Sequence, residues 1–236
     1  MVGWKETVTV KSRLYLSMQH IQSAALFARR SGQIEKEYDG NFSNELLTEY
    51  RADITASIFT AVSFLEATIN ELFADATEEY SEYPESLNSN TKALMADMWK
   101  MRIPRTARYP ILEKFDIALI LARKPTFDAG KSPAQDVDLI VKLRNYLVHY
   151  ETEWMSDETT ASSMAATEKR LSKHLRGKFS TSPLMGRNNP FFPNKCLSYG
   201  CALWAVGSSL AYSDEFYKKL GVPAPYEHIR QCLRTI

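Results

Sequence analysis

Apolar residues recur every three or four positions along most of this chain, the spacing that gathers them on one face of an α-helix. The longest such run covers about residues 46–76. Its apolar stripe consists of Ile54, Ile58, Ala61, Leu65, Ile69 and Leu72. A second run covers residues 14–30 and gives way to the polar segment "RSGQIEKEYDGNFSN". The pattern predicts two long helices joined by a loop, with the 46–76 helix at the centre of the core.

The remaining segments also have helical spacing, interrupted by Pro and Gly. Helices are predicted over residues 92–101 and 111–124, on either side of the Pro-bounded connector "RIPRTARYP". A further helix runs to about Tyr150, with Pro133 just before its start. The short segment "VTV" near the beginning of the chain has no partner strand. We therefore expect an all-α fold.

The sequence indicates one domain with an excursion near its end. No internal repeat, low-complexity tract or linker divides the 236 residues. The expected single all-helical domain spans residues 1–236, with its core over about 10–150. A polar excursion over about 152–194 follows, with alternating acidic and basic residues and a long loop. An apolar helix over about 196–220 then packs back onto the core, followed by a short terminal helical turn.

The overall charge of the chain gives no global attraction to polyanions. There are 29 Lys and Arg against 28 Asp and Glu, a formal net charge of +1. A nucleic-acid site must therefore be local. The N-terminal segment lacks the apolar core of a signal peptide, and the apolar stretch "CLSYGCALWAVGSSLAY" is interrupted and short for a membrane span. We expect a cytoplasmic protein without membrane contact.

The cysteines suggest neither a metal centre nor redox chemistry. Cys196, Cys201 and Cys232 form an odd set without CxxC spacing, which favours buried free thiols. The sequence also contains no GxSxG, P-loop, HExxH or GxGxxG motif. No metal and no cofactor are expected.

The octet "LRNYLVHY" at 143–150 places a guanidinium, a carboxamide and an imidazole within an apolar helical segment. A helical projection places Arg144 in the middle of the apolar face, while Asn145 and His149 share the neighbouring polar edge. Burying an unpaired guanidinium costs several kcal/mol, roughly, so Arg144 needs a carboxylate, a backbone cluster or an anionic ligand. Glu66, one turn before Asn70 on the edge of the 46–76 stripe, could supply that carboxylate. On the residues alone, an Arg144–Glu66 pair joining two helices is the simpler interpretation.

The segment "RNYLVH" has the pattern R-N-x-x-x-H, which resembles the signature of the HEPN superfamily of small helical proteins, many of which are RNases. Arg144, Asn145 and His149 match its three positions, and the upstream "SFLEATINELF" supplies an acidic-polar pair. The resemblance covers about residues 46–150. It implies a HEPN-like up-and-down helical bundle core with additional C-terminal helices.

The resemblance also implies a metal-independent endoribonuclease, in which the ribose 2′-OH attacks the adjacent phosphate and leaves a cyclic phosphate and a 5′-OH. In that chemistry His149 is the candidate general acid or base and Arg144 the group that binds the phosphoryl oxygens. Asn145 either orients His149 or holds a phosphate oxygen. Three further residues are expected to support the site: Glu66, Asn70 and Tyr150.

The reaction needs both a proton donor and a proton acceptor, but the motif contains only one histidine. The family commonly forms two-fold dimers, so the resemblance implies a homodimer whose composite site contains Arg144 and His149 of both chains. It also suggests a prokaryotic toxin or phage-defence effector, with an inhibitory partner protein left open. One toxin branch has a tyrosine two residues after the motif histidine. This chain has Glu151 there, so regulation through that tyrosine is not carried over.

RNA is the expected partner, and basic residues in two segments could guide it. They are Lys100, Arg102, Arg105, Arg108, Lys169, Arg170 and Lys173. Arg13 and His20 also stand at a spacing that a loose form of the motif allows, but Leu14 occupies the polar position, so we interpret the pair as coincidental. The alternative function is a non-catalytic HEPN-like nucleotide- or RNA-binding protein or a dimeric scaffold.

Overall fold

The computed structural model describes residues 13–41, 43–78, 87–104, 109–150 and 166–234, with only the backbone for 166–170. Over these residues the fold is all-α and contains no strand, as predicted. Its helices are α1 (Leu16–Glu37), α2 (Asn44–Asp75), α3 (Ser89–Lys100), α4 (Ile111–Leu121), α5 (Ala134–Val148), α6 (Ala166–Leu175) and α7 (Tyr199–Leu220), with the short turns η2 (Phe191–Lys195) and η3 (Glu227–Leu233). The segment "VTV" lies outside the described residues.

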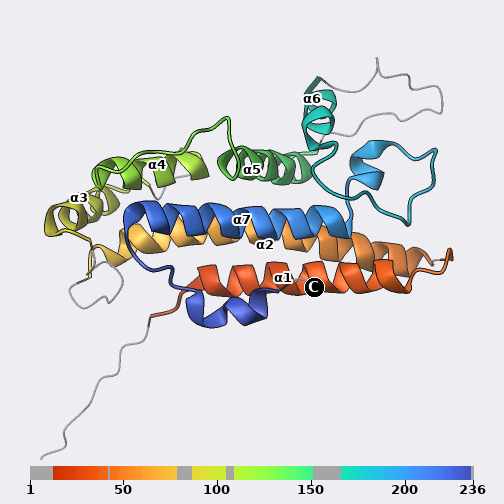
Figure 1. Ribbon diagram of the computed structural model, residues 1–236, viewed down its shortest axis with the longest axis horizontal. Helices are drawn as coiled ribbons and strands as arrows, with labels where there is room; N and C mark the ends of the chain where they lie inside the picture. Colours follow the sequence, from red (N-terminus) through yellow and green to blue (C-terminus); the bar gives the residue numbers. More distant parts are fainter. Residues whose placement is uncertain (1–12, 42, 79–86, 105–108, 151–165, 235–236) are drawn as a thin grey trace, which may run out of the picture.

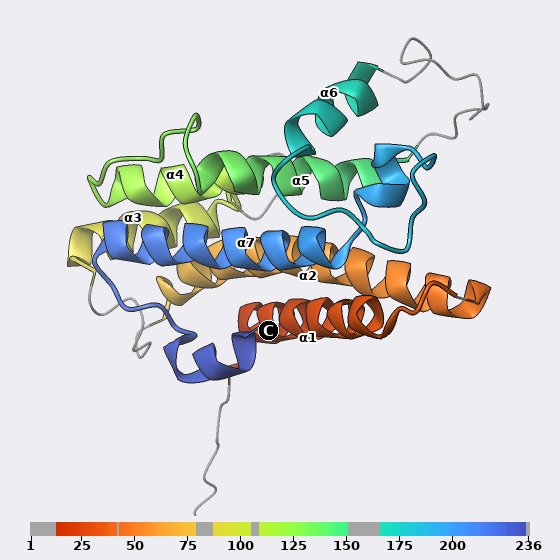
Figure 2. The same ribbon diagram turned by 45° about the vertical axis from the view of Figure 1, so that its right-hand side comes forward.

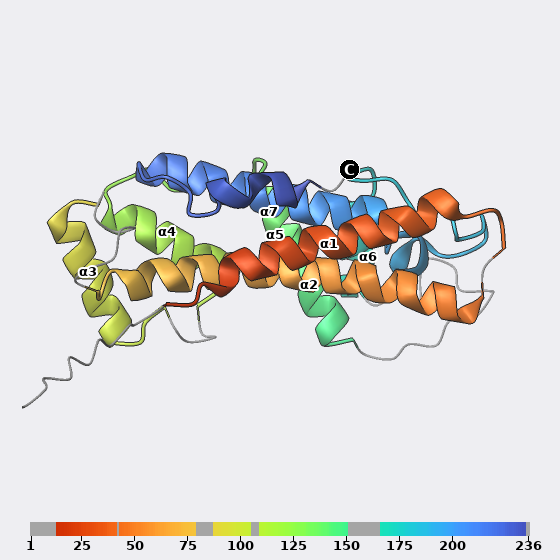
Figure 3. The same cartoon turned by 90° about the horizontal axis from the view of Figure 1, so that it is seen from below.

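Helices α1 and α2 lie side by side and run in opposite directions, and α7 packs against both of them (Figure 1). Helices α4 and α5 follow one another along the other side of α7 and α2. Helix α3 closes one end of the molecule, and α6 projects from the opposite end (Figure 2). Seen from below, α1 crosses α2 at a shallow angle along most of its length (Figure 3). Helix α2 is therefore the central packing element, as predicted.

The buried face of α2 is the apolar stripe that the sequence predicts. Ser43 caps the helix by accepting a hydrogen bond from the Leu46 N–H at 3.2 Å. All six predicted stripe residues are fully buried. Each large aliphatic side chain buried in this way stabilises the fold by about 1.5–3 kcal/mol. Helix α2 is long and apolar enough to cross a membrane by length and composition alone, but a mostly buried core helix passes the same test.

Helix α1 continues beyond its predicted end near Arg30 and stops at Glu37. Tertiary contacts support this extension. The ring of Tyr199 lies against Gly32, where a Cβ would come within 2.8 Å of its Cε2 atom. Glu35 accepts a hydrogen bond from the Tyr199 N–H at 2.8 Å, and burial raises the pKa of the Glu35 carboxyl. These contacts from α7 outweigh the local preference of the polar segment for a loop.

The described part of the predicted polar excursion, residues 166–194, contributes apolar side chains to the buried interior. Four apolar side chains there are buried: Leu171, Leu175, Leu184 and Phe192. Leu171 and Leu175 stand four positions apart and so share one face of α6. This segment covers the end of α5 and belongs to the core.

Helix α7 packs closely on the rest of the fold because small residues line its contact side. Gly200 is buried, and a Cβ at this position would lie 2.3 Å from Ser180 Oγ and 2.5 Å from Ser180 O. We expect Gly200→Ala to lower the free energy of unfolding by about 1–3 kcal/mol through overpacking, measured by urea denaturation. The matched control is Gly207→Ala on the same helix, where a Cβ meets nothing within 4 Å. That change should raise stability by about 0.5–1 kcal/mol, and a loss at both positions would contradict the packing argument.

Candidate functional site

A pocket of about 300 Å³ lies between α1, α2 and α5. Helix α2 contributes its floor, since Ser63, Glu66 and Asn70 stand at helical spacing on one face. Helix α1 contributes His20, and α5 contributes Arg144. The remaining lining residues are Val62 and Ala67. The structure thus brings together three of the predicted site residues, Arg144, Glu66 and Asn70, from helices far apart in the sequence.

The carboxylate of Glu66 is held by Lys114, a residue of α4 that the sequence did not single out. Lys114 is only 1% exposed, and its Nζ donates to Glu66 Oε1 and, at 3.4 Å, to Asn70 Oδ1. A buried ammonium needs such acceptors because its desolvation is costly. The pair fixes Glu66 and Asn70 on the pocket wall.

The expected Arg144–Glu66 ion pair is not formed. Within the described part of the chain, the ion-pair partner of Glu66 is Lys114. Arg144 is half-buried, and its Nε atom is buried without a hydrogen-bond partner. Unsatisfied buried donors are uncommon and costly in folded proteins. Arg144 is therefore a cation at the pocket wall with unused hydrogen-bonding capacity.

The charges around the pocket favour an anion. Lys114 and Arg144 each carry one positive charge and Glu66 carries one negative charge, which leaves one net positive charge while His20 is neutral. The whole chain has a formal net charge of only +1. The positive potential here is thus a local property of the pocket, as a polyanion site on this chain requires.

His20 is a pocket residue that the sequence interpretation dismissed. Arg13 is occupied by ion pairs with Asp75 at 3.1 Å and Glu78 at 3.3 Å and does not line the pocket, which agrees with the interpretation of Arg13 and His20 as a coincidental pair. His20 itself is half-buried and lines the pocket with Arg144. The sequence feature that could have pointed to His20 as a pocket residue is its position beside the buried face of α1.

The other motif residues lie outside the pocket. Helix α5 ends at Val148, two residues earlier than predicted, and the His149 N–H caps it by donating to Asn145 O at 2.9 Å. Asn145, His149 and Tyr150 are all exposed. His149 stands five positions after Arg144, about 140° of helical rotation at 100° per residue. Arg144 thus faces the pocket, whereas Asn145 and His149 face solvent at the end of the helix.

Tyr150 contacts its own helix and does not reach the pocket. Its ring packs edge-on against Tyr146 with centroids 5.7 Å apart, and the side chain remains 46% exposed. Val148 is also exposed. The end of α5 therefore presents apolar and polar side chains together to solvent.

The three predicted RNA-guiding residues whose side chains are described do not line the pocket. Lys100 and Arg102 are exposed at the end of α3, and Lys173 is exposed on α6. These helices lie at opposite ends of the molecule (Figure 1). Arg105 and Arg108 lie outside the described residues, as do the side chains of Lys169 and Arg170. The lysines and arginines whose side chains are described do not form one basic track.

Nothing in the described ranges forms a group of three or more His, Cys, Asp or Glu side chains that could hold a metal ion. Cys196 and Cys201 are buried free thiols, as predicted, whereas Cys232 is exposed. Burial and the neighbouring Cys196 raise the pKa of the Cys201 thiol, which disfavours the nucleophilic thiolate. The chain matches no protein-family model, no curated protein and no solved structure in comparisons with each.

Proposed function

We propose that this protein is a metal-independent endoribonuclease of the HEPN type. Arg144 binds a phosphate of the RNA, and His149 transfers a proton during attack by the neighbouring 2′-OH. The observation that carries the proposal is the unpartnered, buried Nε of Arg144 at the wall of a positively charged pocket. An RNA phosphate would supply the acceptor that this guanidinium lacks within the chain.

The exposure of His149 also supports catalysis over a purely structural role. A histidine that transfers protons to RNA must be reached by the substrate, and His149 stands exposed at the end of α5 next to Asn145. Imidazole is the side chain that exchanges protons near neutral pH. Asn145 lies on the same exposed edge, where it can hold a phosphate oxygen or orient the imidazole.

A homodimer is part of this proposal. The exposed end of α5 combines Val148 and Tyr150 with Asn145 and His149, so an isologous contact there would bury apolar surface and place two motif histidines close together. The active cleft would then contain residues of both chains. A toxin or phage-defence role, an inhibitory partner protein and a cytoplasmic location remain predictions. Growth arrest on overproduction in a bacterial host would support the toxin or defence role.

A second candidate function is binding of a nucleotide or RNA without cleavage. The separation of Arg144 from His149 favours this alternative, since the pocket is complete without the motif histidine. A pocket of about 300 Å³ is in the range that accepts a small ligand. A non-catalytic protein would bind RNA but leave it intact in every assay.

The test is cleavage of total RNA and labelled tRNA in the presence of EDTA. We expect cleavage by the unaltered protein, and a loss of at least about 100-fold in His149→Ala, the usual scale of a lost general acid or base. His228→Ala is the matched control, because His228 is exposed on η3 and lines no part of the pocket. Melting temperature and oligomeric state should be equal in all three proteins. RNA left intact by the unaltered protein would exclude the nuclease and favour the binding function.

A further inference from the structure

Cleavage by 2′-OH attack needs two proton transfers on opposite sides of the phosphorus. The attacking oxygen must lose a proton, and the leaving oxygen must gain one. The motif supplies one histidine per chain, so the second group comes either from the motif of the partner chain or from another residue of the same chain. His20 lines the same pocket as Arg144 and comes from a different helix, α1.

We propose that His20 is the second proton-transferring residue of this site, supplied by the same chain as Arg144. The inference rests on the proposed nuclease function and names a catalytic residue that the motif does not contain. A phosphate bound by Arg144 in this pocket shares the pocket with the imidazole of His20 from α1. The imidazole of the partner's His149 approaches across the dimer contact at the end of α5.

The step balances with these two groups and needs no further reactant. A lone pair of the 2′-oxygen forms the new bond to phosphorus while the 2′-OH proton passes to a neutral imidazole. The bond between phosphorus and the 5′-oxygen breaks, its electron pair stays on that oxygen, and the second imidazole, protonated beforehand, donates a proton to it. The products are a 2′,3′-cyclic phosphate and a 5′-hydroxyl. Arg144 stabilises the charge that grows on the non-bridging oxygens.

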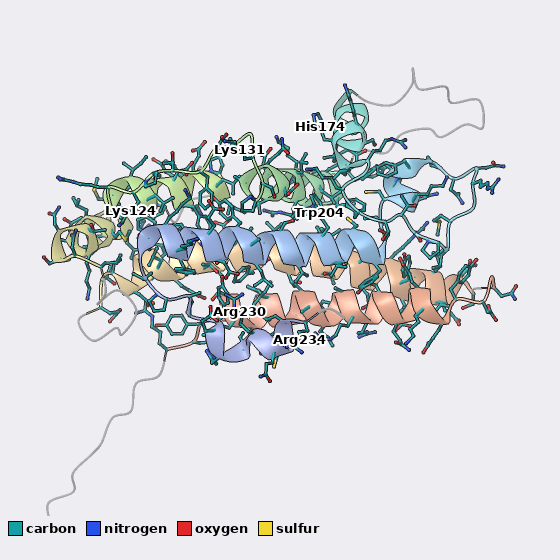
Figure 4. All side chains as sticks on the ribbon, in the orientation of Figure 1. Lys124, Lys131, His174, Trp204, Arg230 and Arg234 are labelled. Carbon is teal, nitrogen blue, oxygen red and sulfur yellow. The ribbon has the colours of Figure 1, made fainter. Side chains whose placement is uncertain are left out.

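The other ionisable groups near the pocket are less suited to this role. Lys114 is 1% exposed and is tied to Glu66 and Asn70, so substrate cannot reach it. Glu66 is the counter-ion of that buried ammonium. His174 is on the projecting helix α6, well separated from α1 (Figure 4). Among the side chains that line the pocket, His20 is the half-exposed one that carries an imidazole, the group that proteins most often use for proton transfer.

The first test compares His20→Ala and His20→Asn with the unaltered protein and with His228→Ala. We expect both His20 variants to lose at least about 100-fold in single-turnover cleavage of saturating RNA, with RNA affinity changed by less than about threefold. Asn preserves a polar side chain of similar size, so its failure to restore the rate separates proton transfer from pocket shape. Cleavage by His20→Asn at the rate of the unaltered protein would overturn the proposal.

The second test uses RNA in which the leaving 5′-oxygen is replaced by sulfur. A thiolate leaves without protonation, so loss of the general acid no longer slows the reaction. If His20 and His149 are the two proton-transferring groups, this substrate restores the rate of one histidine variant and leaves the other slow. Restoration of both variants, or of neither, would contradict the assignment of His20.

These experiments separate the two proposals. Suppose that the unaltered protein cleaves RNA, that His149→Ala is inactive and that His20→Asn is fully active. The nuclease function is then supported, and the proposed role of His20 is refuted. If His20→Asn is inactive and His149→Ala is active, the proton-transfer role of His20 is supported and that of His149 is refuted. If the unaltered protein cleaves no RNA, both proposals fall together.

Discussion

Replacement of Arg144 by Ala is expected to slow RNA cleavage by about 10²- to 10³-fold, the scale of a lost oxyanion-stabilising group. The melting temperature should stay close to that of the unaltered protein. Arg144 is half-buried, and its buried Nε forms no hydrogen bond, so the substitution breaks no polar contact of that atom. Arg144→Lys should recover only part of the rate, because an ammonium lacks the planar fork that binds two phosphate oxygens.

Because Glu66 pairs with Lys114, substitutions of Arg144 can separate an effect on activity from an effect on stability. If Arg144 were the counter-ion of Glu66, its removal would weaken both fold and activity, and the two effects could not be separated. Glu66 is held by Lys114 instead. Arg51→Ala is a suitable control, since Arg51 is a half-buried arginine of α2 that does not line the pocket. A large fall in melting temperature of Arg144→Ala with an unchanged rate of cleavage would show that Arg144 is structural.

The helices that the sequence predicted well are those with a long, regular apolar period. Along α2 the three- and four-residue spacing continues from Ile54 to Leu72, about five turns, and every residue of the predicted stripe is buried. Such a pattern determines both the helix and its buried face, whatever packs against it. The ends of helices were less predictable, because α1 continues through Gly32 and Glu35 only with contacts from Tyr199.

The sequence predicted several residues of the candidate site, but it did not predict all the residues that surround them in space. Arg144, Glu66 and Asn70 do meet in one pocket. Lys114 was missed because a lysine inside "ILEKFD" has the pattern of a solvent-exposed residue, and its partner lies 48 positions away in the sequence. His20 was missed because its neighbours in space come from α2 and α5. A helical projection gives the direction of a side chain but not the helix that it faces.

The pair of Lys114 and Glu66 is expected to respond very differently to loss of one partner or the other. Glu66→Ala leaves a 1% exposed ammonium with only Asn70 as acceptor, and should lower the free energy of unfolding by about 3 kcal/mol. This value is at the low end for a broken buried pair because the Glu66 side chain is 37% exposed. Lys114→Met removes the buried charge, keeps an unbranched apolar side chain and leaves a carboxylate that water can reach. It should cost less than about 1.5 kcal/mol.

Urea denaturation of the two single variants and of Lys114→Met/Glu66→Gln measures this asymmetry. The double variant should be close to the unaltered protein, because neither partner is left charged and alone. Equal losses in Glu66→Ala and Lys114→Met would contradict the argument. It would mean that the two residues contribute only an ordinary surface ion pair, worth up to about 1 kcal/mol.

The same variants connect the pair to the proposed activity. In Lys114→Met the carboxylate of Glu66 loses its counter-ion, and Arg144 is the arginine that lines the same pocket and is left to compete for it. A guanidinium occupied by Glu66 cannot bind RNA phosphate, so Lys114→Met should fold stably and cleave RNA at least about tenfold more slowly, a competition worth about 1.4 kcal/mol. Lys114→Met/Glu66→Gln removes the competing carboxylate and should regain most of that loss. If the single variant keeps its full rate, Lys114 does not keep Arg144 available.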